Sequence, residues 1–324
     1  MRKIITSILL VCLLVPLLTA RETEPLATAK PASGEKPLRL AFITTCKDAP
    51  FFEPVKKGMR DAAEKMGVAC DWLGTEHVDV PAQAALVRKA VADGYDGIAL
   101  SIIDAKAFDA VVEEAIKQGV PVVAFNVDDN GTPNARLSGV SQQFVPAGRA
   151  LAKRVAADVP REAHLLATLH DRGISALDER LLGMQEGLKD KNIRWTVVVT
   201  GNDTVKAEAL IADALRKDPA IRGVFGTGQA DTEAAGHVIE KHFADRGYWA
   251  AGFDLSPEIL RLVKSGRIRC TVDQQPYIQG FYPVVQLTHY LRYGIHPSNV
   301  DAGATIVDQE TVDRVIELAR KKYR

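Results

Sequence analysis

The sequence predicts an α/β protein with two similar lobes, each a three-layer sandwich in which helices cover both faces of a parallel sheet. From Leu38 onward, short apolar runs rich in β-branched residues alternate with amphipathic stretches. Strands that are separated by helices run parallel, and a parallel sheet is buried on both faces. The alternation begins again near residues 140–144, so we expect two sets of about four or five strands, one for each lobe.

The elements follow one another as repeated βα units. The first set opens with a strand at 38–45 and a helix at 51–67, where Val55 and Met59 share one face and Gly67 marks the end. It continues with strands at 68–74, 97–103 and 121–127 and helices at 81–94 and 105–119. The second set has strands at 164–170, 195–201, 221–228, 248–254 and 268–273 and helices at 145–158, 175–190, 205–218, 230–243 and 257–266.

The bulk composition excludes several classes of partner. With 324 residues, the chain is long enough for two domains of ordinary size. Its 41 Lys and Arg residues balance its 41 Asp and Glu residues, so the net charge is zero. Such a chain has no bulk electrostatic basis for binding nucleic acid or an anionic membrane, and we expect a small ligand or a protein partner.

The N-terminus has the layout of a secretory signal peptide. A basic pair precedes an apolar run at 4–18, which is shorter than the ~20 residues that a membrane-spanning helix needs. We assign 1–29 to the signal peptide, with cleavage after Ala20 or Ala29, and 30–37 to a disordered leader. The mature protein is therefore expected in the periplasm or another extracytoplasmic compartment.

The cysteines are expected to act as small apolar residues. Valine before Cys12 fits a lipoprotein signal poorly, so we expect no lipid anchor. Cys46, Cys70 and Cys270 remain after cleavage, an odd number without the spacing of a metal site. Cys46 ends the first strand and Cys70 begins the second, which places them at opposite ends of a parallel pair and too far apart for a disulfide. We expect all three thiols to be buried.

The sequence has no convincing catalytic, cofactor or metal motif. GTGQAD at 226–231 follows a strand and opens a helix, as phosphate-binding glycine loops do, but it lacks the third glycine and falls late in the chain. His237 and His242 lie five residues apart, a spacing that does not bring them to one helix face. The chain contains no GxxxxGK[ST], GxSxG or HExxH. We expect a protein that is not an enzyme and has no cofactor.

Polar and aromatic side chains gather in the loops that follow the strands. Ligands of open parallel sheets bind outside the carboxyl ends of the strands, where these loops converge. The candidate residues in these loops are Asp48, Phe51, Phe52, Asp104, Asn126, Gln229, Asp231 and Asp254. Rings stack on the C–H faces of a sugar, and planar polar groups hydrogen-bond its hydroxyls, so this set suits a neutral polyhydroxy ligand.

The leading candidates also have purely structural interpretations. Phe51 and Phe52 are adjacent, and we expect one of them to plug the end of the sheet while Pro50 starts the helix. Asp254 precedes a helix and could be its cap. Arg180 could be a solvated residue on a helix surface.

Residues 38 to 308 together resemble the periplasmic sugar-binding proteins of the ribose and galactose class, which have the type I solute-binding fold. The resemblance is carried by APFF at 49–52, DGIAL at 96–100, VPVVAFN at 120–126, DERLLGM at 178–184, GFD at 252–254 and TVDQQPYIQG at 271–280. It implies that the sugar is held by Phe51, Phe52, Asn126, Arg180, Asp254 and Gln274. Weaker additions are Asp48, Asp104, Gln229, Asp231 and Asp273, and Gln279 is expected only to pack or to lie on a helix surface.

This chain also departs from the ribose binders. They usually have Asn-Pro-Phe-Phe where this chain has Ala49-Pro50-Phe51-Phe52, and Asp-Arg where it has Asn126-Val127. The resemblance therefore implies the sugar class and not ribose itself.

The resemblance further implies a mechanism. Two lobes joined by three crossing segments can close on a ligand that contacts both. The implied crossings lie near 140–144, 270–276 and 303–307. The implied lobes are 38–141 plus 276–304 and 142–275 plus 305–324. A monomer of this class delivers its ligand to the membrane permease of an ABC transporter, or it docks on a chemoreceptor or a sensor kinase.

Two other functions compete with a sugar receptor. The sensing core of a transcription regulator shares the fold but needs an N-terminal helix-turn-helix, where this chain has a signal peptide. An exported sugar-modifying enzyme could use Asp48, Asp104 and Asp254 as paired carboxylates, but no nucleophile motif or metal spacing accompanies them. A non-enzymatic carbohydrate or polyol receptor therefore fits best.

Overall fold

A computed structural model describes residues 37–104, 106–128 and 134–324. The expected signal peptide and all of the expected leader except Pro37 lie outside these residues. In the part of the chain that is described, no helix is both long enough and apolar enough to cross a membrane.

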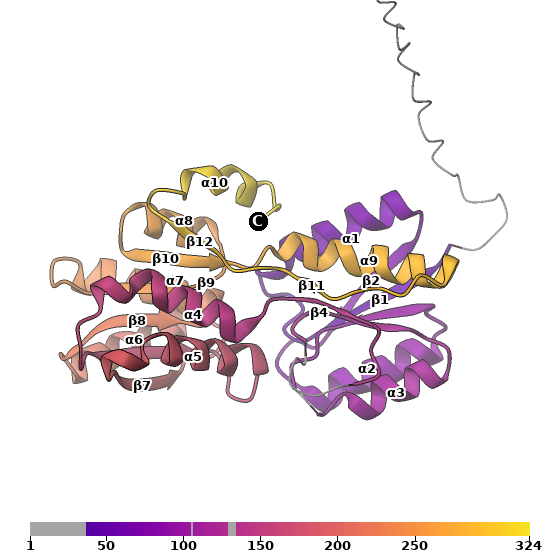
Figure 1. The fold of residues 1–324 in the computed structure, drawn as a ribbon, viewed down its shortest axis with the longest axis horizontal. Helices are drawn as coiled ribbons and strands as arrows, with labels where there is room; N and C mark the ends of the chain where they lie inside the picture. The colour runs from indigo at the N-terminus through magenta and orange to yellow at the C-terminus, as the bar shows by residue number, and fades with distance from the viewer. Residues whose placement is uncertain (1–36, 105, 129–133) are drawn as a thin grey trace, which may run out of the picture. The chain divides into compact units, whose positions relative to one another are not determined.

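The first lobe is built on a six-stranded parallel sheet with the order β11-β5-β4-β3-β1-β2. Its strands are β1 (Arg39–Thr44), β2 (Ala69–Gly74), β3 (Gly97–Leu100), β4 (Val122–Asn126), β5 (Gly139–Ser141) and β11 (Val300–Asp301). Helices α1 (Phe52–Met66) and α9 (Pro276–Tyr293) cover one face, and α2 (Val80–Ala92) and α3 (Asp109–Lys117) cover the other (Figure 1). The predicted three-layer arrangement is confirmed for this lobe.

The second lobe repeats the plan with the order β12-β10-β9-β8-β6-β7. Its strands are β6 (His164–Leu169), β7 (Arg194–Val199), β8 (Ile221–Gly226), β9 (Trp249–Phe253), β10 (Ile268–Asp273) and β12 (Thr305–Asp308). Helices α4 (Phe144–Val155) and α5 (Ser175–Gly187) cover one face. The other face carries α6 (Thr204–Lys217), α7 (Gln229–Val238) with a π-helical turn at Ile239–Phe243, α8 (Pro257–Lys264) and α10 (Asp313–Arg320).

The prediction missed three short strands, and one of them changes the sheet type. β5, β11 and β12 are two to four residues long, too short to show an alternating pattern. β12 pairs antiparallel with β10, so the second sheet is mixed and not wholly parallel. An antiparallel edge strand on an otherwise parallel sheet is common in proteins of this class.

The chain passes between the two sheets three times. It leaves β5 for α4 through 142–143, leaves β10 for α9 through 274–275, and leaves β11 for β12 through 302–304. Amide side chains tie these segments together. Gln142 Nε2 donates to Gly303 O at 2.8 Å, and Gln275 Nε2 donates to Ala302 O at 2.8 Å. The three crossings therefore behave as one hydrogen-bonded group.

Each lobe also contains a pair of helices that cross at facing glycines. In the first lobe, a Cβ on Gly58 of α1 would lie 2.0 Å from Tyr277 O, and one on Gly280 of α9 would lie 1.9 Å from Val55 O. In the second lobe, a Cβ on Gly148 of α4 would lie 2.2 Å from Arg180 O. No other residue allows two helix backbones to approach so closely.

The cysteines agree only in part with the prediction. The three thiols in the described part of the chain are free. Cys270 is buried, but Cys46 and Cys70 are only partly buried, which corrects the expectation for these two. Burial raises the pKa of the Cys70 thiol to about 12, so this thiol stays protonated and unreactive at neutral pH.

Candidate functional site

A cavity of about 890 Å³ lies where the carboxyl ends of the two sheets face each other. Its walls come mainly from the residues that follow β1 to β4 in the first lobe and β6 to β10 in the second. The two lobes touch at its edge, where the backbone N–H of Ser175 donates to Ile103 O at 3.2 Å. The volume is at the upper end of the range for small-molecule sites, about 300–1,000 Å³.

Eight of the ten predicted ligand residues line this cavity. They are Asp48, Phe51, Phe52, Asn126, Arg180, Gln229, Asp254 and Gln274. Residues far apart in the sequence are thus gathered by the convergence of strand ends, as the topology predicts.

The other two predicted residues, Asp104 and Asp231, do not line the cavity. Asp104 Oδ1 accepts from the backbone N–H groups of Lys106 and Ala107 and so caps the turn that follows it. Asp231 is fully buried and accepts from the backbone N–H of Thr227 at 2.9 Å and from Thr168 Oγ1 at 2.8 Å. Because these carboxylates shape the protein's own loops, we remove both from the candidate site.

Arg180 lies within the cavity wall and is not a solvated helix residue. Its side chain is buried, with 3% of the residue's surface exposed. Two of its nitrogens donate to Gln142 Oε1 at 3.1 and 2.9 Å, and Nη1 donates to Thr227 O at 2.8 Å. The guanidinium also lies 4.3 Å from the ring centre of Phe253 and 5.4 Å from that of Phe144.

Asp254 is the acidic counterpart of Arg180. Burial raises the pKa of the Asp254 carboxyl, and the positive charge of Arg180 opposes that rise. Its Oδ1 accepts from Gln274 Nε2. The cap of the following helix is Ser256, whose Oγ accepts from the backbone N–H of Ile259 at 3.0 Å. The helix-cap interpretation of Asp254 is therefore wrong, and its carboxylate is available to the cavity.

The two phenylalanines have different surroundings. Phe52 is 6% exposed and packs in the core of the first lobe, with its ring 5.2 Å from Trp72 and 5.1 Å from Phe51. Phe51 is partly exposed and lines the cavity. Helix α1 begins at Phe52, so Pro50 precedes the helix and does not start it. The stacking surface for a sugar is therefore mainly the Phe51 ring.

Three residues at the cavity have a left-handed backbone. Cys46, Asn126 and Asp254 have φ angles of 49°, 63° and 73°. Each lies within two residues of the carboxyl end of a strand, β1, β4 or β9. Asn and Asp tolerate this region better than other residues with a side chain, but it remains an uncommon conformation. Such conformations concentrate at functional sites because they aim a side chain that a regular strand end would not.

Several residues that the structure places around the site carry no separate signal in the sequence. Phe144 and Ser101 line the cavity, and Gln142 fixes Arg180 from behind. Gln279 is fully buried and hydrogen-bonds both Asn126 and Gln274, so the expectation that it only packs or lies on a helix surface is wrong. The one available signal was the density of amides in 271–280.

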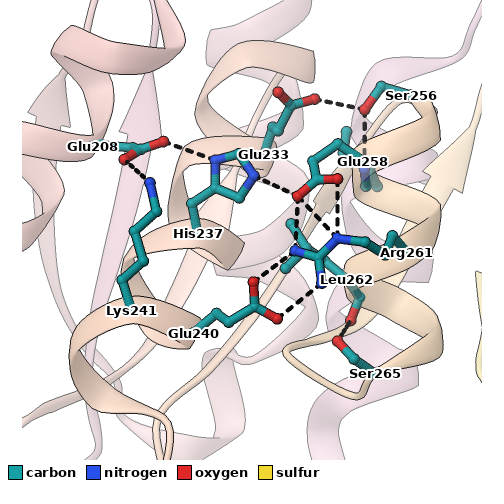
Figure 2. A network of polar contacts seen from close by, with 11 residues as sticks. Glu208, Glu233, His237, Glu240, Lys241, Ser256, Glu258, Arg261, Leu262 and Ser265 are labelled. Atoms are coloured by element: carbon teal, nitrogen blue, oxygen red, sulfur yellow. Dashed lines mark hydrogen bonds and ion pairs between the residues drawn. The ribbon is translucent and has the colours of Figure 1, made fainter.

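A polar network supports the mouth of the cavity on the side of the second lobe (Figure 2). Glu233, Ser256 and Glu258 line the cavity here, and Ser256 Oγ donates to Glu233 at 2.6 Å. These residues come from α7, the start of α8 and α8 itself. The network therefore fixes two helix starts against each other at the cavity mouth.

His237 is the centre of that network. Its Nδ1 lies 2.7 Å from Glu208 and its Nε2 lies 2.7 Å from Glu258, so each ring nitrogen faces a carboxylate. Arg261 donates to both Glu258 and Glu240. The hydrogen bonds from Arg261, assisted by His237, lower the pKa of the Glu258 carboxyl to about 2, against the effect of partial burial.

The chain is similar to known proteins in both sequence and structure. The family of periplasmic binding protein domains matches residues 40–294. The chain is 26% identical to the xylose/arabinose-binding protein XylF of Sulfolobus acidocaldarius over 297 residues, 87% of this chain and 74% of that protein. It is also 26% identical to the ribose import binding protein RbsB of Bacillus subtilis, over 86% of this chain and 90% of that protein.

Solved structures agree with this relationship. A carbohydrate transporter from Acidothermus cellulolyticus 11B, in complex with myo-inositol, superposes with a TM-score of 0.81 at 28% identity and covers 89% of this chain and all of that one. The XylFII–LytSN complex superposes with a TM-score of 0.79 at 17% identity, over 86% of this chain and all of that one, which is a likeness of fold alone.

Proposed function

The chain belongs to the family of periplasmic binding protein domains, and from this premise we propose that it is an extracytoplasmic receptor for a neutral monosaccharide or polyol. The family is a class of solute-binding proteins. The names of the relatives, which refer to xylose, arabinose and ribose, and the myo-inositol complex of a structural neighbour support a sugar or polyol as the ligand.

One observation carries the proposal. A single cavity combines the partly exposed ring of Phe51 from the first lobe with buried Arg180 and Asp254 from the second. The ring offers a flat apolar surface to the C–H face of a sugar, and the charged groups offer strong hydrogen bonds to its hydroxyls. A neutral ligand fits because Arg180 and Asp254 already interact with each other, so a charged ligand would leave one of them poorly compensated.

We propose that the ligand is held between two closing lobes, with lobe boundaries at 38–141 plus 276–304 and 142–275 plus 305–324. The segments at 142–143, 274–275 and 302–304 would bend together, because their side chains hydrogen-bond one another. A ligand that contacts Phe51 on one lobe and Asp254 on the other favours the closed form by bridging them.

A binding screen tests this function. The purified mature protein would be melted with pentoses, hexoses, sugar alcohols and inositols, with sugar acids and amino sugars as charged comparisons. A neutral binder at ~100 times its dissociation constant stabilises the protein by about 2.7 kcal/mol, which a thermal melt detects readily. A melt that no neutral carbohydrate or polyol shifts, or that only charged compounds shift, would overturn the proposal.

As its membrane partner we propose the permease of an ABC transporter, to which a monomer of this protein delivers the ligand. The import role in the name of the Bacillus subtilis relative supports this choice. The alternative partner is a chemoreceptor or a sensor kinase. Deleting the coding sequence should abolish uptake of the radiolabelled sugar that binds in the screen. Normal uptake together with a lost transcriptional or chemotactic response to that sugar would favour the sensor instead.

A further inference from the structure

The inner end of the cavity contains a chain of five polar side chains that crosses between the lobes. Ser101 Oγ donates to Asn126 Oδ1 at 3.4 Å, and Asn126 Nδ2 donates to Gln279 Oε1 at 3.2 Å. Gln279 Nε2 donates to Gln274 at two oxygens, the backbone O at 2.7 Å and Oε1 at 3.1 Å. Gln274 Nε2 donates to Oδ1 of Asp254, which ends the chain in the second lobe.

All the hydrogen bonds in this chain point toward Asp254. Gln274 Nε2 donates to Oδ1 of Asp254, so the amide of Gln274 presents its nitrogen to this carboxyl group. The side-chain oxygen of Gln274 then points toward Gln279, and Gln279 Nε2 donates a hydrogen bond to it. The oxygen of Gln279 is left to accept from Asn126. One carboxylate therefore fixes the orientation of three amides, and bonds aligned in this way strengthen one another.

This orientation determines what a ligand meets. Asn126, Gln274 and Asp254 line the cavity, whereas Gln279 is fully buried behind them. The side-chain oxygens of Asn126 and Gln274 are already engaged within the chain. Each of these two amides has a second N–H, so toward a ligand they act as donors, and Asp254 is the acceptor beside them.

We propose that Gln279 is a positioning residue that sets which face of the Asn126 and Gln274 amides the ligand meets. The inference rests on the proposed function, because it assumes a polyhydroxy ligand in this cavity. It adds a statement about that ligand, which places hydroxyl oxygens opposite the two amides and donates one hydroxyl to Asp254.

Two substitutions at this position separate orientation from packing. Gln279→Met fills a similar volume but neither donates nor accepts, so Gln274 can turn either way. Gln279→Glu still accepts from Asn126 but, when ionised, cannot donate to Gln274, whose amide must turn its oxygen toward Asp254. We expect affinity for the probe sugar to fall roughly 10-fold for the methionine variant and roughly 100-fold for the glutamate variant at pH 8.

The probe is whichever of xylose, arabinose, ribose and myo-inositol shifts the melt of the wild-type protein most. Its affinity is measured by calorimetry between pH 8 and pH 5. A buried glutamic acid has a raised pKa, and its protonated carboxyl both donates and accepts as the amide does. The loss of affinity of Gln279→Glu relative to the wild type should therefore become smaller as the pH falls, while the loss of affinity of Gln279→Met stays constant. Asp254, Asp273 and Arg180 also lie near the chain and are present in every variant, so their own titration affects Gln279→Met and the wild type alike. A pH trend that appears only in Gln279→Glu therefore reports the new carboxyl, including its coupling to Asp254.

Gln286 provides a matched control on the same helix. Its amide accepts from Ser138 Oγ at 2.9 Å and donates to Ser298 O at 2.8 Å, and it does not line the cavity. Gln286→Met should leave the affinity for the probe within about twofold of wild type, since its hydrogen bonds lie outside the site.

The outcomes distinguish this inference from the function on which it rests. If the wild-type protein binds none of the four probes and no other neutral carbohydrate, the proposed function fails. Two results with a wild type that does bind would show that Gln279 only packs, and each would overturn the inference. In the first, both Gln279 variants bind the probe within twofold of the wild-type affinity. In the second, the two variants lose the same factor in affinity at every pH. If Gln279→Glu does not fold, Gln279→Met still decides. In Gln279→Met the amides of Asn126 and Gln274 are free to turn, so the ratio between the affinities for the probe and for its monodeoxy analogues should be smaller than in the wild type. An unchanged ratio would overturn the inference.

Discussion

The two lobes share a scaffold but contribute different chemistry to the cavity. Each has a six-stranded sheet between two helical layers and a pair of helices that cross at glycines. The first lobe contributes the ring of Phe51 and the neutral amide of Asn126. The second contributes Arg180 and Asp254, which are both ionisable and buried. The scaffold therefore fixes where a ligand can bind, and the loops of each lobe decide how.

This division has an energetic consequence. Removing charges from water is costly, and the second lobe offsets that cost internally, because Arg180 is hydrogen-bonded by Gln142 and Thr227 and packed between aromatic rings. The lining that the first lobe contributes at the inner end is neutral. Arg180 and Asp254 both belong to the second lobe, so closure does not separate them, and a neutral ligand can shift the balance between the two forms. An ion pair that does join the two lobes, Lys322 with Glu53 at 2.7 Å, lies outside the cavity lining.

The largest effect is expected from Arg180→Ala. It leaves Asp254 buried without its compensating charge, which costs about 3–5 kcal/mol of stability, and it removes donors from the cavity. The variant should show no thermal shift with a sugar that shifts the wild type by about 2.7 kcal/mol. Arg149→Ala is the control, because that arginine lies on the exposed surface of neighbouring α4 and pairs with Glu186. A full shift in Arg180→Ala would mean that the second lobe does not supply the charged contacts.

A second test concerns the rings of the first lobe. Phe52→Ala should cost about 3–5 kcal/mol of stability, because this side chain is packed against Trp72 in the core. Phe51→Ala should cost much less stability but weaken sugar binding roughly 10-fold, because the partly exposed ring faces the cavity. Urea unfolding and calorimetry measure the two quantities. Equal losses of stability in the two variants would show that Phe51 belongs to the core and not to the site.

The sequence predicted the lobes well because each depends on long periodic patterns. Helices such as α1 and α8 carry an apolar face that packing requires, and buried parallel strands read as continuous apolar runs. The edge strands β5, β11 and β12 were missed because a few residues carry no periodicity. β12 follows the third crossing between the lobes, and it pairs antiparallel with β10. Tertiary contacts, and not the local sequence, determine the direction in which the chain enters the second sheet there.

At the site, the topology could place residues but could not orient them. Asn126 and Asp254 were predicted because each ends a strand. Asp104 lies in the loop after β3 and Asp231 in the first turn of α7, and the carboxylates of both accept from nearby backbone N–H groups. Composition does not distinguish this use from ligand binding. Gln279 was misjudged because its role depends on contacts with Asn126, 153 residues earlier in the chain.

The glycine crossings test whether the two scaffolds are equivalent. Gly58→Ala and Gly148→Ala each place a methyl group where a backbone oxygen of the facing helix lies, at 2.0 Å and 2.2 Å. The helices must move apart in both cases, and we expect each variant to lose about 1–3 kcal/mol in urea unfolding. A loss under about 0.5 kcal/mol in one lobe alone would show that its helix pair is not as constrained as that of the other lobe.

The smallest expected effect comes from Glu258 at the cavity mouth of the second lobe. Hydrogen bonds from Arg261 and His237 lower the pKa of this carboxyl to about 2. Because its pKa is below the value of about 4.3 expected in the unfolded chain, the contribution to stability is complete above that pH and is lost as the pH falls through about 2. Since a third of the side chain is exposed, with 34% of its surface accessible, the contribution should stay below about 1 kcal/mol.

Melting curves from pH 7 to pH 2 for the wild type and for Glu258→Gln measure this contribution. The glutamine variant should be slightly less stable at pH 7, and the difference should vanish toward pH 2 as Glu258 becomes protonated in the wild type. A constant difference across that range would mean that the stabilisation comes from packing and not from the charge. The mouth of the second lobe would then rely on packing, and the electrostatic contribution of the second lobe to the cavity would be confined to Arg180 and Asp254.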